Sequence, residues 1–304
     1  MATWLITGVT GLLGSNAALE LARRHRIVGS ARTMPHDVSI GFASADLSKP
    51  ASRAGLVEKA SAQIVLHAAA ISSINECEQD PELAHEVNVL ASADLAAQAR
   101  AFGARFVYVS TDAVFDGARG GYLEADEPSP ISEYGRSKVA AERAVLAANP
   151  DALIARVNFY GWSPDGQRSL AEFFFHRLSR GETVPGFDDV AVSTTYVGHL
   201  VEMLEQLIDL GASGIVNVVS SEPTSKYEFG RRLALSFGFD QKLVLAAKST
   251  DHLAIRRGSR LNLSTKRLTA LLGTTPPSQQ DGMDRLVADR RGRRAQAVAS
   301  FRTG

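Results

Sequence analysis

Six short apolar segments recur along the chain, and most of them are separated by longer segments with helical spacing. The apolar segments have strand length and read TWLIT, RIVGSA, QIVLHAA, RFVYVS, ALIARV and GIVNVV. Helical patterns run over residues 12–24, 81–102, 133–148 and 197–210. Continuous apolar strands that alternate with helices indicate a parallel sheet covered on both faces. We therefore predict an α/β fold of the Rossmann type, with a doubly wound parallel sheet.

A glycine-rich turn follows the first apolar segment directly. Its three glycines stand in TGVTGLLG, between a predicted strand and the predicted helix that follows it. Glycine permits a sharp turn and lets a pyrophosphate approach the free N–H groups at the helix N-terminus. The spacing is G-x-x-G-x-x-G rather than G-x-G-x-x-G, but its place at the first strand–helix junction favours a dinucleotide site. We expect the following residues of this turn to bind the cofactor: Gly8, Thr10, Gly11, Leu12, Leu13 and Gly14.

The end of the second predicted strand bears on which dinucleotide binds. An acidic residue in this place meets the adenosine ribose of NAD(H), whereas an arginine accommodates the 2′-phosphate of NADP(H). This strand ends with Ser30 and Arg32, and no carboxylate comes before Asp37. The sequence therefore favours NADP(H) over NAD(H), with Arg32 in the cofactor site. A solvated charge at the end of the strand is the alternative interpretation of Arg32.

The alternation of strands and helices loosens after about residue 155, where Gly and Pro recur in GWSPDGQRSLAEFFFHRLSRGETVPGFDD. We expect residues 1–157 to form the dinucleotide-binding domain, with 193–220 returning to it. Residues 158–192 and 221–304 are expected to form most of a smaller C-terminal lobe that binds the substrate. The Arg-rich end, ADRRGRRAQAVASFRTG, is expected to be a solvated or frayed tail.

Composition argues against several classes of partner and chemistry. The 33 basic and 33 acidic residues cancel, so charge gives no reason to expect nucleic acid or an anionic membrane as a partner. The single cysteine, Cys77, forms no intrachain disulfide and favours the reducing cytoplasm. No apolar run has the length of a membrane span, and the seven histidines lack metal-ligand spacing, so we expect no metal. A G-x-S-x-G nucleophile turn is also missing.

Three residues form the predicted catalytic group. Tyr134 and Lys138 are four apart in EYGRSK, at the start of a predicted helix, so both project from one face. A tyrosine has a pKa of about 10, and a lysine one turn away would stabilise the phenolate and bring that pKa towards neutrality. Thr111 ends a predicted strand in VYVSTDAVFDG, where its hydroxyl is placed to hold a substrate oxygen beside Tyr134.

With these segments together, the chain resembles the extended short-chain dehydrogenases/reductases, and among them it is similar to the dTDP-4-dehydrorhamnose reductases and their relatives. The resemblance spans about residues 3–272 and is carried by TGVTGLLG, ADL, HAAA, NECEQDPELAHEVN, STDAVFDG and YGRSK. It implies hydride transfer from NADPH to C4 of a nucleotide-linked 4-keto-6-deoxy sugar, with Tyr134 as proton donor. Homodimers are common in this superfamily, so the resemblance makes a homodimer one candidate assembly, while the sequence leaves the oligomeric state open.

The resemblance also implies roles for further residues. Two of them would lie near the adenine, three along the cofactor backbone and three against the sugar, while an asparagine would support the site from its helix and Lys138 would also reach the nicotinamide ribose. The residues near the adenine are Asp46 and Leu47, and those along the cofactor backbone are Ala68, Ala69 and Ala70. The residues against the sugar are Asp112, Val114 and Phe159, and the supporting asparagine is Asn88.

Three departures from the family pattern leave the identity of the sugar open. Ala113 stands where a tyrosine is usual, Phe159 where a tryptophan is expected, and Gly258 where a proline is expected. Ala113 also argues against a 4,6-dehydratase, because those enzymes place an Asp-Glu pair after the threonine. Two alternatives remain: an NAD-dependent sugar-nucleotide epimerase, and a non-catalytic dinucleotide-binding regulatory subunit like that of methionine adenosyltransferase.

Overall fold

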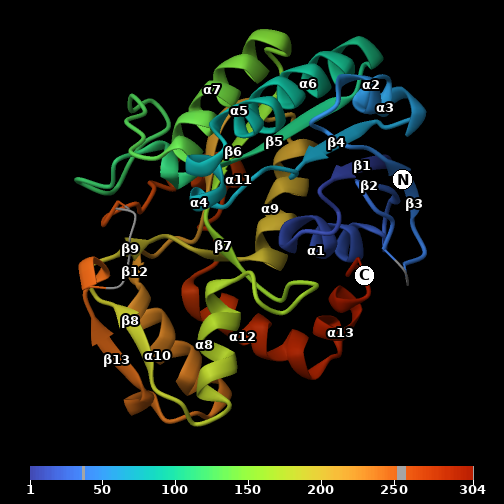
Figure 1. Ribbon diagram of the computed structural model, residues 1–304. Coiled ribbons are helices and arrows are strands. Elements are labelled where there is room, and N and C mark those ends of the chain that lie inside the picture. The colour runs from blue at the N-terminus through green and yellow to red at the C-terminus, as the bar shows by residue number, and fades with distance from the viewer. Residues whose placement is uncertain (36–37, 252–257, 304) are drawn as a thin grey trace.

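The computed structural model describes residues 1–35, 38–251 and 258–303, and a parallel sheet of seven strands lies at its centre (Figure 1). The strands are β1 (Thr3–Thr7), β2 (Arg26–Ala31), β3 (Gly41–Ser44), β4 (Ile64–His67), β5 (Arg105–Thr111), β6 (Leu153–Val157) and β11 (Gly214–Val218). Their order is β11-β6-β5-β4-β1-β2-β3, with every neighbouring pair parallel. The predicted Rossmann-type α/β fold is therefore confirmed.

Burial explains why six of these strands were visible in the sequence. β4 and β6 are buried at every residue, so apart from His67 and Arg156 their sequences are apolar and do not alternate. The seventh strand, β3, reads GFAS, has no buried residue and pairs only with β2 at the edge of the sheet. A four-residue edge strand with one large apolar residue shows no apolar pattern, so nothing in the sequence marked it as a strand.

Helices cover both faces of the sheet. On one face α1 and α9 pack against each other, and α11 contacts α9; on the other face α6 packs against α3, α7 and α2. Figure 1 shows these two layers on opposite sides of the strands. No helix in the described ranges is long and apolar enough to cross a membrane. The bounds are α1 (Leu12–Leu21), α2 (Pro50–Arg53), α3 (Leu56–Lys59), α4 (Ile74–Gln79), α5 (Pro81–His85), α6 (Ala91–Phe102), α7 (Glu133–Ala148), α9 (Val197–Asp209) and α11 (Lys266–Leu272).

The helix expected over 81–102 is interrupted in its middle. A π-helical turn, η1 (Glu86–Leu90), lies between α5 and α6. Such turns occur often at functional sites because the extra residue re-aims the side chains around it. Here the turn contains Asn88, whose side chain is described with the site below.

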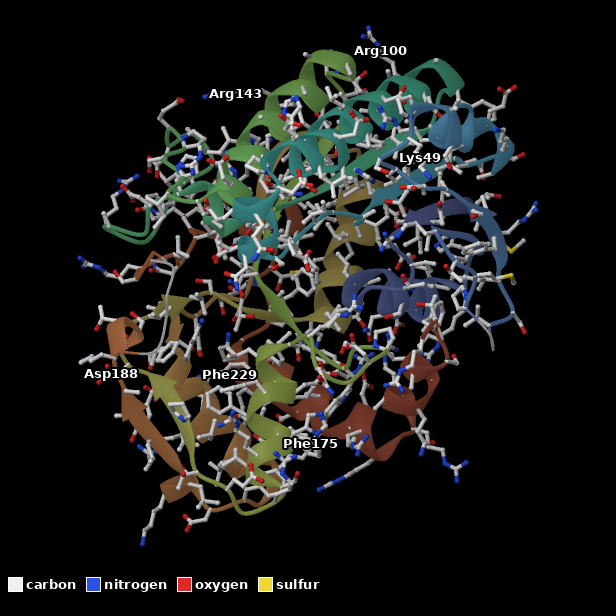
Figure 2. The ribbon with its side chains drawn as sticks, viewed as in Figure 1. Lys49, Arg100, Arg143, Phe175, Asp188 and Phe229 are labelled. Atoms are coloured by element: carbon white, nitrogen blue, oxygen red, sulfur yellow. The ribbon has the colours of Figure 1, made fainter. Side chains whose placement is uncertain are left out.

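Most segments after β6, other than α9, β11 and α11, form a group of their own beside the sheet. In this group α10 packs on α8, β8, β13 and α12. Figure 2 shows Phe175 and Phe229 inside this group, whereas Arg100 and Arg143 lie at the outer edge of the α6–α7 layer. The division into two lobes that was expected from the sequence stays a prediction. The elements are β7 (Phe159–Tyr160), α8 (Leu170–Leu178), β8 (Val184–Phe187), β9 (Ala191–Val192), β10 (Thr195–Tyr196), β12 (Thr224–Ser225), α10 (Lys226–Phe237), β13 (Val244–Ala247), α12 (Gln279–Arg291) and α13 (Arg294–Ala299).

The Arg-rich end is helical, and the expectation of a frayed tail was wrong for α13. Arg294 at the start of α13 donates to Glu20 of α1, with 2.7 Å between Nη1 and Oε2. Both side chains are less than a tenth exposed. A buried charge of this kind is tolerated only when it is paired, so the contact attaches the C-terminal helices to the helix that follows the glycine turn.

Candidate active site

A cleft of about 670 Å³ lies along the carboxyl ends of the central strands. The strand order reverses between β1 and β4, and open α/β sheets bind their ligands in the crevice at that point. Most of the predicted site residues line this one cleft, and they come from separate segments of the chain. They are Gly8, Thr10, Gly11, Leu12, Leu13, Gly14, Arg32, Asp46, Leu47, Ala68, Ala69, Ala70, Thr111, Asp112, Tyr134, Lys138 and Phe159.

The glycine turn between β1 and α1 forms the middle of the cleft. Gly8 has a φ of +68°, and a Cβ added there would lie 2.8 Å from Cα of Ala69. A Cβ on Gly14 would collide with the carbonyl oxygen of Gly8. No side chain caps α1, whose first N–H groups have no partner within the helix and open towards the cleft. Close backbone approach and free N–H groups together suit a pyrophosphate.

The opposite wall of the cleft, residues 68–70, is held by a buried chain of hydrogen bonds. Thr7 Oγ1 lies 2.6 Å from His67 Nδ1, and His67 Nε2 lies 2.9 Å from Ser92 Oγ. Because the Ser92 hydroxyl donates to the carbonyl of Asn88, it accepts from Nε2–H, and Nδ1 therefore accepts from Thr7. Thr7 in turn accepts from the Ala69 N–H. Burial lowers the pKa of His67 to about 3, so the ring is neutral and acts as a structural link.

One end of the cleft is formed by the ends of β2 and β3. Arg32 lines it, is exposed, and forms no ion pair with any described residue. Asp46 also lines this end, but its carboxylate accepts hydrogen bonds from the hydroxyl and N–H of Ser48, which lower its pKa. Asp37, the first carboxylate after the strand, lies outside the described residues. The arrangement presents a guanidinium that suits a phosphate group.

At the other end, the start of α7 carries the predicted catalytic pair. Ser132 caps the helix by accepting from the Gly135 N–H, so α7 begins at Glu133 and places Tyr134 and Lys138 one turn apart. Both residues line the cleft. Tyr134 is partly exposed, whereas Lys138 is buried and donates from Nζ to the carbonyl of Val109 at 2.7 Å.

The expected lowering of the Tyr134 pKa is not what the structure has. Burial raises the pKa of Tyr134 well above its usual value, the Thr111 hydroxyl lowers it in part, and the charge of Asp112 raises it further. Burial also lowers the pKa of Lys138 to about 7. In this state Tyr134 is therefore protonated at neutral pH.

Thr111 and Asp112 belong to a short polar network beyond the end of β5. Thr111 Oγ1 donates to Asp112 Oδ1 at 3.1 Å and accepts from the Ala113 N–H at 3.2 Å. Asp112 Oδ2 accepts from Asn158 Nδ2 at 2.6 Å, and burial raises the pKa of Asp112 to about 6. Asn158 also lines the cleft and was not predicted from the sequence, where its one signal is a polar residue directly after a strand.

A second cavity of about 250 Å³ lies beside this end of the cleft and is bounded in part by the same side chains, including Thr111, Asp112 and Tyr134. Two of the departures from the family pattern, Ala113 and Gly258, also line it. Further walls come from segments distant in sequence, such as α10 with Lys226, and nothing in the sequence pattern located them. No group of three or more His, Cys, Asp or Glu suited to a metal ion occurs within the described ranges.

Two predicted site residues do not line the cleft. Val114 was expected to face the sugar, but the turn η2 (Asp112–Val114) directs its side chain into an apolar cluster with Phe115 and Tyr122, where it is fully buried. Asn88 lies behind the lining. Its amide holds both the N–H and the carbonyl of Ile71, at 2.8 and 3.0 Å, and donates to Ser137 Oγ on α7.

Known proteins with similar sequences include reductases and a subunit of methionine adenosyltransferase 2. Residues 2–291 match the family described as RmlD substrate binding domain. The chain is 33% identical over 289 residues to the probable low-salt glycan biosynthesis reductase Agl14 of Haloferax volcanii (93% of this chain, 96% of that protein). It is 30% identical over 279 residues to dTDP-4-dehydrorhamnose reductase of Mycobacterium tuberculosis H37Rv (90% and 88%). It is also 32% identical over 243 residues to methionine adenosyltransferase 2 subunit beta of Xenopus tropicalis (77% and 71%).

Solved structures of similar shape carry nicotinamide dinucleotides. The dTDP-4-dehydrorhamnose reductase of Bacillus anthracis, in complex with NADP, is 25% identical with a TM-score of 0.85, over 95% of this chain and 99% of that chain. The UDP-glucose 4-epimerase of Thermus thermophilus, in complex with NAD, is also 25% identical, with a TM-score of 0.79 and the same coverage of 95% and 99%.

Proposed function

This chain belongs to the RmlD substrate binding domain family, and we propose on that premise that it reduces a nucleotide-linked 4-keto-6-deoxy sugar to the 4-hydroxy sugar with NADPH. The family lies within the extended short-chain dehydrogenases/reductases, which are nicotinamide-dependent oxidoreductases. One observation carries the proposal: Thr111, Tyr134 and Lys138 line the same cleft as the glycine turn.

The residues of the cleft fit a dinucleotide. The glycine turn and the open N-terminus of α1 would hold the pyrophosphate, and Arg32 would hold the 2′-phosphate that distinguishes NADP(H) from NAD(H). Asp46 and Leu47 would border the adenine, and Ala68, Ala69 and Ala70 the middle of the cofactor. When bound, the reduced nicotinamide supplies the hydride that adds to the carbonyl carbon of the sugar.

In the proposed mechanism Tyr134 donates its phenolic proton to the oxygen at C4 as negative charge develops there. The phenol carries this proton at neutral pH, and a positive charge on Lys138 would make it easier to donate by stabilising the phenolate. Thr111 would turn its hydroxyl from Asp112 to the same oxygen and so orient the carbonyl beside Tyr134. Lys138 would contribute positive charge next to the phenolate that remains and would hold the nicotinamide ribose.

The sugar would occupy the second cavity next to Thr111. Asp112, held by Asn158, would accept a hydrogen bond from a sugar hydroxyl, and Phe159 would cover one side of the ring. Ala113 and Gly258 leave more room in this cavity than a tyrosine and a proline would, so the preferred sugar is expected to be set here rather than at the cofactor.

A regulatory role is the second candidate, and the 32% identity to the Xenopus tropicalis subunit is the observation that favours it. Such a protein would bind the dinucleotide without turning it over. The presence of Thr111, Tyr134 and Lys138 in one cleft favours catalysis over that role.

The test follows the absorbance of the reduced nicotinamide in a mixture of purified protein, a dTDP-4-keto-6-deoxy sugar and either NADPH or NADH. The proposal predicts stoichiometric oxidation, faster with NADPH. Tight binding of NADPH without oxidation, across several nucleotide-linked 4-keto sugars, would contradict it and favour the regulatory role. Oxidation of NADH at a rate equal to or greater than that of NADPH would contradict the cofactor preference.

A further inference from the structure

The amino group of Lys138 is buried without a carboxylate beside it. Its side chain is 2% exposed, and its one hydrogen bond within the described chain is to the carbonyl of Val109. The nearest acidic residue on α7 is Glu142, one turn further on. Both Glu142 oxygens are occupied, because Arg156 donates to each of them at 3.0 and 2.7 Å and Ser110 donates to Oε1 at 2.5 Å.

The face of an aromatic ring is the other group that contacts this amine. Nζ of Lys138 lies 4.1 Å from the centroid of the Tyr108 ring. Tyr108 is on β5, one residue before the carbonyl that accepts from Lys138, and its side chain is 1% exposed. A ring face attracts a cation through its quadrupole, and the attraction grows when both groups are removed from water.

The phenolic hydroxyl of Tyr108 does not explain why an aromatic residue stands at this position. It is buried near the Ser92 hydroxyl, but that hydroxyl already donates to the carbonyl of Asn88, and the phenol forms no hydrogen bond of ordinary geometry with any described residue. A buried hydroxyl without a partner costs free energy, so the ring itself is the part of the side chain that the fold uses.

We propose that Tyr108 is a positioning residue, whose ring face keeps the buried Lys138 ammonium charged and directed into the cleft. This proposal rests on the proposed function, in which the positive charge of Lys138 stabilises the phenolate of Tyr134 and its amino group binds the nicotinamide ribose. Without the ring, the amine would have a single carbonyl to offset its burial, and its charge would be lost at a lower pH.

Other titratable groups around the amine leave this role to the ring. His67 on β4 faces Tyr108, with ring centroids 5.9 Å apart, and is neutral because burial lowers its pKa. Glu142 and Cys77 favour the charged lysine, but burial outweighs them. Among the described residues, the titratable and charged groups on the elements packed around this amine are Tyr134 and Glu142 on α7, Cys77 on α4, His67 on β4, Tyr108 on β5, Arg156 on β6, and Asp112 beyond β5.

The test weakens the ring face without changing its shape. Tyr108→Phe is made first, and then phenylalanines with increasing numbers of ring fluorines are incorporated at position 108. The pKa of Lys138 is read directly from the chemical shift of its Cε in protein with ¹³C-labelled lysine, and Lys138→Arg identifies the resonance. Pentafluorophenylalanine at Phe106, two residues earlier on β5 and also buried, is the matched control.

The proposal predicts a stepwise fall in the Lys138 pKa with added fluorine, about one unit in total, with Tyr108→Phe close to the wild-type protein and the control unchanged. A Lys138 pKa that is the same throughout the series would overturn it. This readout needs no turnover, so it is independent of whether the chain proves to be a reductase. If it is one, the high-pH limb of kcat/KM should move down with the Lys138 pKa, and a limb that stays in place would also overturn the proposal.

Discussion

The two halves of the cleft are built by different means. In the cofactor half the surfaces are mainly backbone and small side chains: the turn from Gly8 to Gly14, the open end of α1 and residues 68–70. In the proposed substrate half they are larger side chains, most of them apolar, brought together from α4, α7, α8 and residues 258–261. A few polar groups stand among them, such as Thr111, Asp112 and Lys226. The difference teaches that side-chain substitutions can reshape the second cavity, whereas at the glycine turn the backbone itself forms the surface and leaves little room for substitution.

The largest effect is expected at the boundary of the two halves, from Tyr134→Phe. The substitution removes the proton donor and keeps the ring, so turnover should fall by roughly two to four orders of magnitude. The dissociation constant for NADPH, measured by fluorescence titration, should change little because the pyrophosphate site lies at the glycine turn. Wild-type turnover in this variant would show that Tyr134 is not the acid.

Asp112→Asn tests whether the buried carboxylate of Asp112 lowers the stability of the folded protein when it is ionised. Burial raises the folded-state pKa of Asp112 from its ordinary value of 3.8 to about 6. The folded protein then binds the proton more tightly than the unfolded chain, so stability from this group is present below about pH 4 and is lost as pH rises through 6. The loss amounts to about 3 kcal/mol.

The Asp112→Asn variant cannot titrate at this position. Its free energy of unfolding, measured with urea at several pH values, should therefore lack the decline that the wild-type protein shows between about pH 4 and 7. If the free energy of unfolding fell equally in both proteins over this pH range, ionisation of Asp112 would not destabilise the fold.

Arg32→Ala addresses the cofactor half. Loss of a charge-assisted contact to the 2′-phosphate should weaken NADPH binding about 10- to 100-fold, and NADH binding should stay within about twofold. Arg100→Ala is the control, because Arg100 lies on the outer edge of the α6–α7 layer (Figure 2) and should affect neither cofactor. Equal losses for NADPH and NADH would remove the 2′-phosphate argument.

The smallest effect is expected from Ala113→Tyr, which restores the residue usual in the family. The larger side chain would narrow the second cavity, so the ratio of kcat/KM values for two nucleotide sugars should change by roughly tenfold or less. NADPH affinity should not change. An effect on NADPH affinity as large as that on the sugar would contradict the separation of the two halves.

The same contrast explains how much could be predicted from sequence. β1 and α7 begin and end where the apolar and helical patterns placed them, and the glycine turn was recognisable because its three glycines lie close together in the chain, directly after a predicted strand. The edge strand β3 has no apolar pattern, and Asn158 and Lys226 reach the site only through the fold. The prediction for Val114 was wrong for a similar reason, because a short turn that no sequence pattern marks directs its side chain into an apolar cluster.

The most direct test of the proposed reaction follows the hydrogen that is transferred. NADPH carrying deuterium at the transferable position of its nicotinamide is incubated with the protein and a dTDP-4-keto-6-deoxy sugar, and the product is analysed by mass spectrometry and NMR. The account predicts one deuterium, located at C4 of the sugar, for each NADPH oxidised. Oxidation with the label elsewhere, or bound NADPH that is never oxidised in the presence of the sugar, would contradict it.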